Sequence, residues 1–170
     1  HSISNDYSSY EYFVDLDGDG DIDVVGTGGG KTFWFENNGS QSFTERTIGS
    51  VALNDNVNAI DVDKDGDIDI VGTGNWFENN GSESFTSHSL STGDLSPYAV
   101  SAGDVDGDGH VDVVSAGFKW IDNPSGFGQI PTGAIYWFEN TTAAPTTPTF
   151  MAATITTDAN SAEDVFAIDL

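Results

Sequence analysis

The chain has 170 residues, of which 28 are acidic and 4 are basic; its formal net charge is -24 and it contains no cysteine. Such a charge repels phosphate backbones and anionic lipid surfaces, and the basic residues are too scattered to form a basic patch, so we expect no nucleic-acid partner. The lack of cysteine excludes disulfides, thiolate zinc sites and cysteine nucleophiles, and no stretch approaches the roughly 20 apolar residues that span a bilayer, so we expect no membrane insertion.

An acidic motif recurs along the chain and defines its repeats. Copies begin at Asp15, Asp61 and Asp104, about 45 residues apart, and a further copy begins at Asp169. A strand rich in valine and isoleucine follows each acidic run. Because self-similarity at a fixed period marks a repeat architecture, we expect three similar structural units.

Each repeat continues through further predicted strands. An aromatic strand that ends in Phe-Glu-Asn follows at 33–37, 76–79 and 136–140. Asn-Gly turns come next in the first two copies and are typical of tight hairpins, and a last short strand follows. Four short β segments in about 45 residues match the blade of a β-propeller. We therefore predict an all-β fold of propeller-type blades, arranged as an incomplete ring or an open repeat array.

Aligning the repeats gives the expected boundaries. Three blades are too few to close a propeller, which needs about four to eight. We therefore expect open strand edges that pair with copies of the same chain or with the rest of a longer one. The predicted units are the end of a preceding blade (1–11), blade 1 (12–56), blade 2 (57–99), blade 3 (100–164) with insertions at 120–135 and 141–149, and the start of a following blade (165–170).

The acidic loops place carboxylates at positions 1, 3, 5 and 9 of a nine-residue turn. These carboxylates repel one another unless a hard cation with six to eight oxygen ligands lies between them, and the spacing indicates calcium rather than magnesium or zinc. Gly20, Gly66 and Gly109 stand at position 6, where a sharp turn needs a residue without Cβ. Position 7 is expected to contribute only its backbone carbonyl, which explains why histidine replaces aspartate there in the third loop.

We predict about three Ca²⁺ ions, one in each acidic loop. The alternative, that these are merely solvated turns, is disfavoured because three copies at matching spacing share the same flanking strands. The bound ions are expected to be structural and to pin each hairpin. The predicted ligands are Asp15, Asp17, Asp19, Asp21 and Asp23 in the first loop, Asp61, Asp63, Asp65, Asp67 and Asp69 in the second, and Asp104, Asp106, Asp108, His110 and Asp112 in the third, with Asp21, Asp67 and His110 acting through the backbone carbonyl.

These Asp-x-Asp-x-Asp-Gly-x-x-Asp loops, each followed by a valine-rich strand and a Trp-Phe-Glu-Asn strand, resemble FG-GAP/VCBS-type repeats. Repeats of this type build calcium-bearing β-propellers in the integrin α head and in many secreted bacterial proteins. The resemblance covers essentially the whole chain. It implies blades of four antiparallel strands, with calcium in the loop between the first two strands. It also implies an extracellular protein, secreted or at the cell surface of a bacterium, that acts in adhesion or scaffolding.

Tryptophans recur in the repeats, at Trp34, Trp76, Trp120 and Trp137. We interpret them mainly as core or inter-blade packing, because aromatic side chains dominate burial. Trp120 and Trp137 lie in the irregular third repeat and are the residues expected to form an exposed ligand surface. Asn38, Asn80 and Asn140 begin glycosylation sequons, of which the first two also form hairpin turns.

The sequence favours a non-catalytic role. No nucleophile elbow is present, and half of the acidic residues, 14 of 28, lie in the loops, where an ion would occupy them. The leading hypothesis is a calcium-stabilised extracellular scaffold or filament module that assembles with copies of itself. The alternatives are an adhesin module that binds a glycan or a cell-surface protein, and the accessory propeller of a larger polysaccharide-degrading enzyme.

Overall fold

The structure, a computed structural model, describes residues 11–40, 42–50, 56–90, 93, 95–142 and 147–156. Within these ranges the chain forms β-strands and no helix. None of the described segments is a helix of the length and apolarity that crossing a membrane requires. The blade ends predicted at 1–11 and 165–170 lie outside the described residues, except for Glu11, which begins the first strand.

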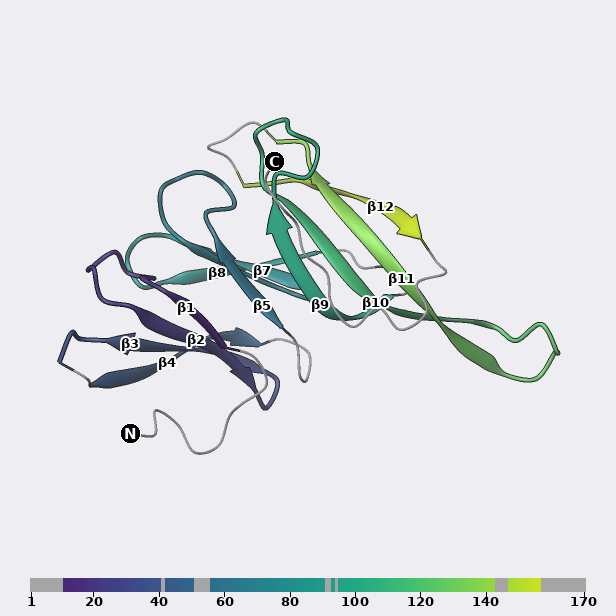
Figure 1. Ribbon diagram of the computed structural model, residues 1–170, viewed down its shortest axis with the longest axis horizontal. Helices are drawn as coiled ribbons and strands as arrows, with labels where there is room; N and C mark the ends of the chain where they lie inside the picture. Colours follow the sequence, from purple (N-terminus) through teal and green to yellow (C-terminus); the bar gives the residue numbers. More distant parts are fainter. Residues whose placement is uncertain are drawn as a thin grey trace.

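The strands form three four-stranded antiparallel sheets, in which neighbours along the chain are neighbours in the sheet (Figure 1). We call these sheets blade 1, blade 2 and blade 3. Blade 1 contains β1 (Glu11–Val14), β2 (Asp23–Gly28), β3 (Lys31–Asn37) and β4 (Phe43–Ser50); blade 2 contains β5 (Val57–Ile60), β6 (Asp69–Gly72), β7 (Asn75–Asn79) and β8 (Phe85–Ser89); blade 3 contains β9 (Leu95–Gly103), β10 (Asp112–Asp122), β11 (Gln129–Asn140) and β12 (Phe150–Thr156). The predicted all-β fold of propeller-type blades is confirmed.

Asn-Gly turns close the last hairpins of blades 1 and 2, as their sequences predict. In blade 1 the Asn38 N–H donates to the carbonyl of Ser42 (3.2 Å). Gly39 and Gly81 have φ values of 71° and 68°, a region that glycine enters without steric cost. A Cβ at either glycine would also collide with the carboxylate at position 7 of the acidic loop. In blade 3 the longer segment 141–149 replaces this turn, and its ends are joined by a backbone hydrogen bond of 3.2 Å.

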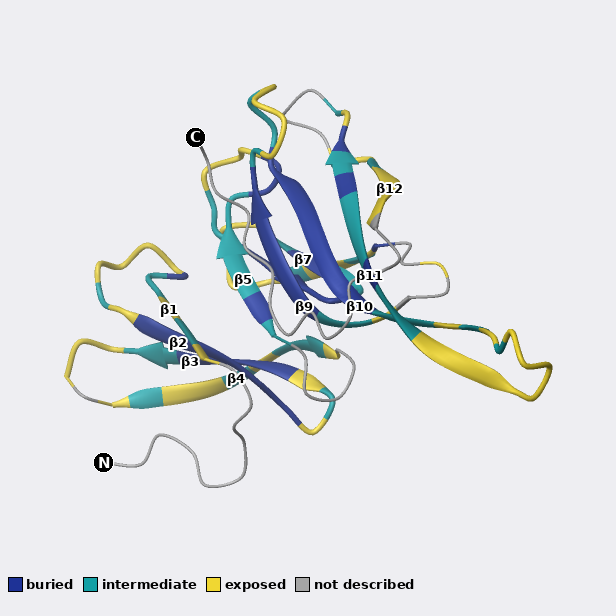
Figure 2. Cartoon of the chain, turned by 45° about the vertical axis from the view of Figure 1, so that its right-hand side comes forward, coloured by how far each residue is buried: buried dark blue, intermediate teal, exposed yellow. Residues whose placement is uncertain are grey.

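The hydrophobic core lies between the blades, which pack face to face. Val25 and Trp34 of blade 1 join Ile70 and Phe77 of blade 2 in one buried cluster. A second cluster connects the opposite face of blade 2, including Trp76, with blade 3. Figure 2 shows the buried residues concentrated along central strands such as β2 and β10. The repeated tryptophan of blades 1 and 2 therefore serves inter-blade packing.

The first insertion expected in the third repeat, at 120–135, lengthens the hairpin of β10 and β11. The two strands stay paired as far as Asp122 and Gln129. Figure 2 shows the far end of this hairpin as an exposed arm that projects from the blades. Trp120 lies on the arm and is 51% exposed, whereas Trp137 lies within the blade and is half-buried. The two tryptophans expected to share an exposed surface therefore occupy different environments.

Replacing a buried inter-blade tryptophan should destabilise the chain far more than replacing an exposed one. We expect Trp76→Ala to lower the free energy of unfolding by about 3–5 kcal/mol, because it leaves a cavity between blades 2 and 3. Trp120→Ala should change it by less than about 1 kcal/mol, since this side chain is half in solvent. Urea unfolding followed by circular dichroism measures both. Equal losses in the two variants would contradict the assigned core.

Candidate metal centres

Each acidic loop connects the first two strands of its blade. The loops span residues 15–22, 61–68 and 104–111, so position 9 of the motif is the first residue of the second strand. This is the placement that the sequence resemblance implies. Because the blades share one topology, the loops lie at corresponding ends of the sheets.

The aspartate at position 9 ties each loop to a strand on the far side of the hairpin. Asp23, Asp69 and Asp112 are all completely buried. In blade 2 one oxygen of Asp69 accepts from the N–H of Val62 in the loop (2.8 Å), and the other accepts from the N–H of Asn79 at the end of β7 (2.8 Å). The corresponding bonds in blades 1 and 3 are between 2.7 and 3.2 Å. This carboxylate therefore closes the loop.

The asparagine that ends each third strand is a site residue that the loop motif alone does not single out. Asn79 Nδ2 donates to the carbonyl of Ile68 at loop position 8 (3.1 Å) and to that of Leu16 in the loop of blade 1 (3.3 Å). Asn37 and Asn140 make the equivalent of the first bond in their own blades (3.0 and 3.3 Å). The signal in the sequence is the Phe-Glu-Asn that ends every aromatic strand. The loops are thus supported from outside by a recurrent amide.

Positions 1 and 6 of each loop are also joined. The Gly66 N–H donates to Asp61 Oδ2 (3.0 Å), and the same bond measures 2.9 Å in the first loop and 2.8 Å in the third. Gly66 has a φ of 104°, and its two equivalents also have positive φ. A side chain at this φ would be strained, which gives the physical reason for glycine at position 6.

The structure gathers carboxylates in every loop, but it does not gather all the predicted ligands. In each loop three aspartates have carboxylate oxygens close to one another. Positions 1 and 3 belong to this group in every loop, whereas the third member is position 5 in the first and third loops and position 9 in the second. The position 7 carboxylates of Asp21 and Asp67 lie against the turn glycines instead, which leaves that position its backbone carbonyl. The groups whose oxygens lie within 4.8 Å of one another are Asp15, Asp17 and Asp19; Asp61, Asp63 and Asp69; and Asp104, Asp106 and Asp108.

Two oxygens of these groups are buried and have no hydrogen-bond partner among the described residues: Asp15 Oδ1 and Asp61 Oδ1. Both belong to the aspartate at position 1. A buried, charged oxygen without a partner is costly, and a cation at the centre of the group supplies the missing interaction. The donor atoms are all carboxylate oxygens, which hard cations such as Ca²⁺ prefer. The residues present therefore fit Ca²⁺.

Burial raises the pKa of several loop carboxyls. Desolvation is the largest cause for Asp17, Asp63 and Asp112, and it raises the pKa of Asp69 to about 7. Asp108 is different: its pKa is lowered, mainly because the backbone N–H two residues later donates to it. The charged form is thus disfavoured at most of these positions until a cation stabilises it.

The three sequons occupy different environments. Asn38 and Asn80 are exposed, and each Oδ1 accepts a hydrogen bond from the backbone N–H two residues later (3.0 Å in both turns). Asn140 is buried, and its Nδ2 donates to the carbonyl of Val111. A glycan on this nitrogen would break that contact, so the structure argues against modification at Asn140. The physical reason is that Asn140 corresponds to the strand-ending asparagines and not to the turn asparagines.

Comparison with known proteins relates the repeats to one family. The family model described as FG-GAP-like repeat matches residues 15–72 and residues 61–115. No similar protein was found among curated proteins. A solved structure of a lectin from Agrocybe aegerita, whose title refers to recognition of non-reducing terminal N-acetylglucosamine, is 18% identical with a TM-score of 0.45. The match covers 88% of this chain and 52% of the lectin, so the chain spans about half the length of that protein.

Without calcium, acidification should stabilise the chain. A carboxyl with a raised pKa in the folded state binds its proton before the unfolded chain does. The free energy of unfolding therefore falls as pH rises from about 4 to about 7, the interval between the unfolded and folded pKa values of Asp69. We expect the melting temperature in EDTA to be higher at about pH 5 than at about pH 7.5, as measured by circular dichroism. A melting temperature in EDTA that is higher at about pH 7.5 than at about pH 5 would contradict the raised pKa values.

Proposed function

Because the chain belongs to the FG-GAP-like repeat family, we propose that it is a calcium-stabilised, non-catalytic module of an extracellular scaffold, which assembles with further blades through its open faces. The observation that carries the proposal is the pair of buried, unpartnered oxygens, Asp15 Oδ1 and Asp61 Oδ1. Calcium, when bound, supplies the positive charge that these carboxylate groups lack. The chain itself fixes the groups in place, through the position 9 carboxylate and the strand-ending asparagine of each blade.

A cation in the loop would brace the contact between blades as well as the loop. Leu16 and Val62, at position 2 of the first and second loops, are buried in the two inter-blade cores. Repulsion among neighbouring carboxylates opposes the closed loop that holds these side chains in place. Neutralising that repulsion stabilises the loop and the adjacent blade together. The proposed role of calcium is therefore to stiffen the stack of blades.

A non-catalytic role is supported by the way the acidic side chains are used. The loop carboxylates at positions 1, 3 and 5 accept backbone N–H groups within their own loops. Outside the loops, Glu36 forms an ion pair with Arg46 (2.6 Å) in blade 1, and Glu78 lies 2.6 Å from His88 across the equivalent hairpin of blade 2. Carboxylates that act as general acids and bases face a substrate in pairs with separated pKa values. These acids instead make contacts that hold the blades together.

Blade 3 presents an outer face whose equivalents in blades 1 and 2 are covered. Val105, at loop position 2, is 41% exposed, although Leu16 and Val62 at the same position are buried. Ile155 of β12 is 56% exposed, although its equivalents Ile48 and Leu90 pack in the inter-blade cores, and Met151 on the same strand adds a side chain that is 61% exposed. Large apolar side chains exposed together at a position that neighbouring blades cover favour contact with a further blade.

Blade 1 of a second copy has the complementary face. Val24, Phe33 and Phe35 cluster on the side of blade 1 that faces away from blade 2. The equivalent residues of blade 2, Ile70 and Phe77, are those that contact blade 1. We therefore expect blade 3 of one copy to pack against blade 1 of the next. Such a head-to-tail contact generates a ring if it closes and a filament if it does not.

A second candidate function is ligand binding by the arm of blade 3. Trp120 packs edge-on against Phe118, with ring centroids 5.8 Å apart, and Phe127 at the tip is exposed. Exposed aromatic rings of this kind stack on sugars or anchor protein interfaces. The specific observation in favour of this function is that the aromatic side chains lie on a projecting hairpin, where the core does not use them.

Calcium should raise the melting temperature, and one loop carboxylate should control one ion. We expect Asp61→Asn to lower the number of bound ions from about three to about two in isothermal titration calorimetry and to weaken the stabilisation by calcium. Asp122→Asn, the same change on the exposed arm, is the matched control and should change neither. If Asp61→Asn destabilised the chain as much in EDTA as in calcium, the assigned role would be contradicted.

Self-assembly should depend on the outer face of blade 3. We expect Ile155→Lys to shift the mass measured by light scattering toward the monomer, because it places a charge in the proposed apolar contact. Phe127→Lys, at the tip of the arm, should leave the mass unchanged. An unchanged mass in Ile155→Lys would contradict assembly through this face. Dissociation caused by Phe127→Lys alone would assign the contact to the arm instead.

A further inference from the structure

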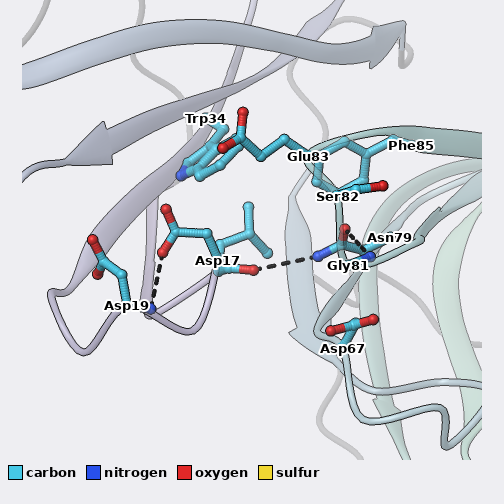
Figure 3. Close-up of a pocket in the computed structure, with 10 residues that line it drawn as sticks. Asp17, Asp19, Trp34, Asp67, Asn79, Gly81, Ser82, Glu83 and Phe85 are labelled. Carbon is cyan, nitrogen blue, oxygen red and sulfur yellow. Dashed lines mark hydrogen bonds between the residues drawn. The ribbon is translucent and has the colours of Figure 1, made fainter.

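An acidic cavity of about 480 Å³ lies between blades 1 and 2 (Figure 3). It opens where the acidic loop of blade 1 meets the acidic loop and the β7–β8 turn of blade 2. Carboxylates from both blades line it, and aromatic rings form part of its wall. The lining residues that matter here are Asp17, Asp19, Asp67, Glu83, Trp34 and Phe85.

The same position between blades 2 and 3 is filled by a lysine of the chain. That site is lined by the equivalents of several residues of the first one, including Asp63 in place of Asp17 and His110 in place of Asp67, and no space for a water molecule remains there. Lys64, at loop position 4, extends into it, and its Nζ donates to the carbonyl of Gly109 at position 6 of the next loop. We call the two equivalent sites between neighbouring blades the first junction (blades 1 and 2) and the second junction (blades 2 and 3). The second junction therefore contains an alkylammonium group that the chain itself supplies.

The cavity between blades 1 and 2 lacks this group because Gly18 occupies the position equivalent to Lys64. Part of its negative charge persists even if calcium fills the loops, since the side chain of Asp67 is not expected to be a calcium ligand. The carbonyl of Gly66 stands at the position equivalent to Gly109. A glycine carbonyl that corresponds to the acceptor of Lys64 thus stands in the second loop, one residue before Asp67, which lines the cavity.

A second feature of the cavity also requires a ligand. The Trp34 side chain is 1% exposed and lines the cavity, yet its Nε1 has no hydrogen-bond partner among the described residues. Figure 3 shows this nitrogen on the side of Asp17. Arg46 lies over the Trp34 ring (5.1 Å to the centroid) and pairs with Glu83 (2.7 Å), so the wall is preformed. A buried indole N–H needs an acceptor oxygen.

We propose that this cavity binds a primary ammonium group on an unbranched alkyl chain, as in a lysine side chain. The ammonium group donates to the carbonyl of Gly66 and to the carboxylate of Asp67, as Lys64 does at the next junction with Gly109. A peptide carbonyl of the same lysine residue supplies the acceptor for the Trp34 N–H. The aliphatic part of the side chain contacts Phe85 and Trp34, a division that long basic side chains commonly make.

This inference goes beyond the proposed calcium and assembly roles, and it can fail independently of them. Binding is tested in saturating calcium with N-acetyl-lysine N-methylamide, by following the tryptophan indole resonances in nitrogen–proton correlation spectra. The Trp34 resonance is assigned from its loss in Trp34→Phe. We expect a saturable shift of this resonance, with a dissociation constant on the order of 1 mM. Absence of any saturable shift would overturn the proposal.

Two other probes separate the chemistry from unspecific attraction to a negatively charged surface. The Nε-acetylated form of the same compound has no charge, and tetramethylammonium has a charge but no N–H donor; neither should shift the Trp34 resonance. Equal shifts with tetramethylammonium would overturn the proposal.

A third probe tests the contact with the Trp34 N–H. 1,5-Diaminopentane should bind more weakly than the lysine derivative, because it has no carbonyl for Trp34. Tighter binding of the diamine would identify a free amine as the ligand.

The matched variants place a lysine at equivalent loop positions. Gly18→Lys should fill the cavity from within and weaken binding of the lysine derivative at least about tenfold, the change expected when a site is occluded. Lys64 itself adopts a φ of 63°, close to the 74° of Gly18, so the loop accommodates lysine there. Gly107→Lys makes the same charge change in the third loop and should leave binding unchanged. Equal effects of the two variants would overturn the assignment to this cavity.

A further variant covers the case in which Gly18→Lys does not fold. Asp67→Asn removes one charge from the cavity wall and is expected to weaken binding about fivefold, the effect of losing one partly exposed ion pair. Its folding is checked by the remaining indole resonances. Unchanged affinity in a folded Asp67→Asn variant would overturn the proposed contact.

Discussion

The buried aspartate at loop position 9 is the interaction on which each blade depends. A carboxylate inside a protein is unfavourable unless hydrogen-bond donors surround it. Asp69 meets this requirement with the N–H of Val62 and the N–H of Asn79. One donor belongs to the loop and the other to the end of the third strand, so one side chain fixes the loop and two strands. The same arrangement recurs in blades 1 and 3.

Loop closure and blade stacking are coupled through residues that belong to both. Leu16 and Val62 lie in acidic loops, yet their side chains are part of the cores between blades. The Asn79 amide adds a polar connection, because it bonds to the loop of its own blade and to the carbonyl of Leu16 in the blade before. A change in the charge of a loop therefore affects the adjoining interface between two blades. This coupling is the reason for proposing that a cation bound in one loop would brace the neighbouring blades as well.

Small departures between the repeats give each junction its own properties. At loop position 4, Gly18 leaves a cavity where Lys64 fills the next one. The residue opposite the repeated tryptophan also varies: the first two blades cover the ring with a basic side chain that contacts a glutamate, and the third does not. The cross-strand partners are Arg46 for Trp34, His88 for Trp76 and Ala153 for Trp137. Among the described residues, a scaffold of near-identical blades thus carries an open cavity between blades 1 and 2 and open apolar faces on blades 1 and 3.

The sequence by itself determined the features that depend on local pattern. The repeat period, the valine-rich and aromatic strands and the Asn-Gly turns specify four-stranded antiparallel blades, because strand pairing in a meander joins neighbouring segments. The spacing of the loop aspartates likewise determined that each loop gathers a group of carboxylates, since these side chains come from one short turn. Only the tertiary structure decided which asparagines are buried, that Asn79 supports two loops and that a cavity opens at one junction. These features rest on contacts between blades, such as that of Asn79 with Leu16, 63 residues apart, and no local pattern encodes which side chain meets which across such an interface.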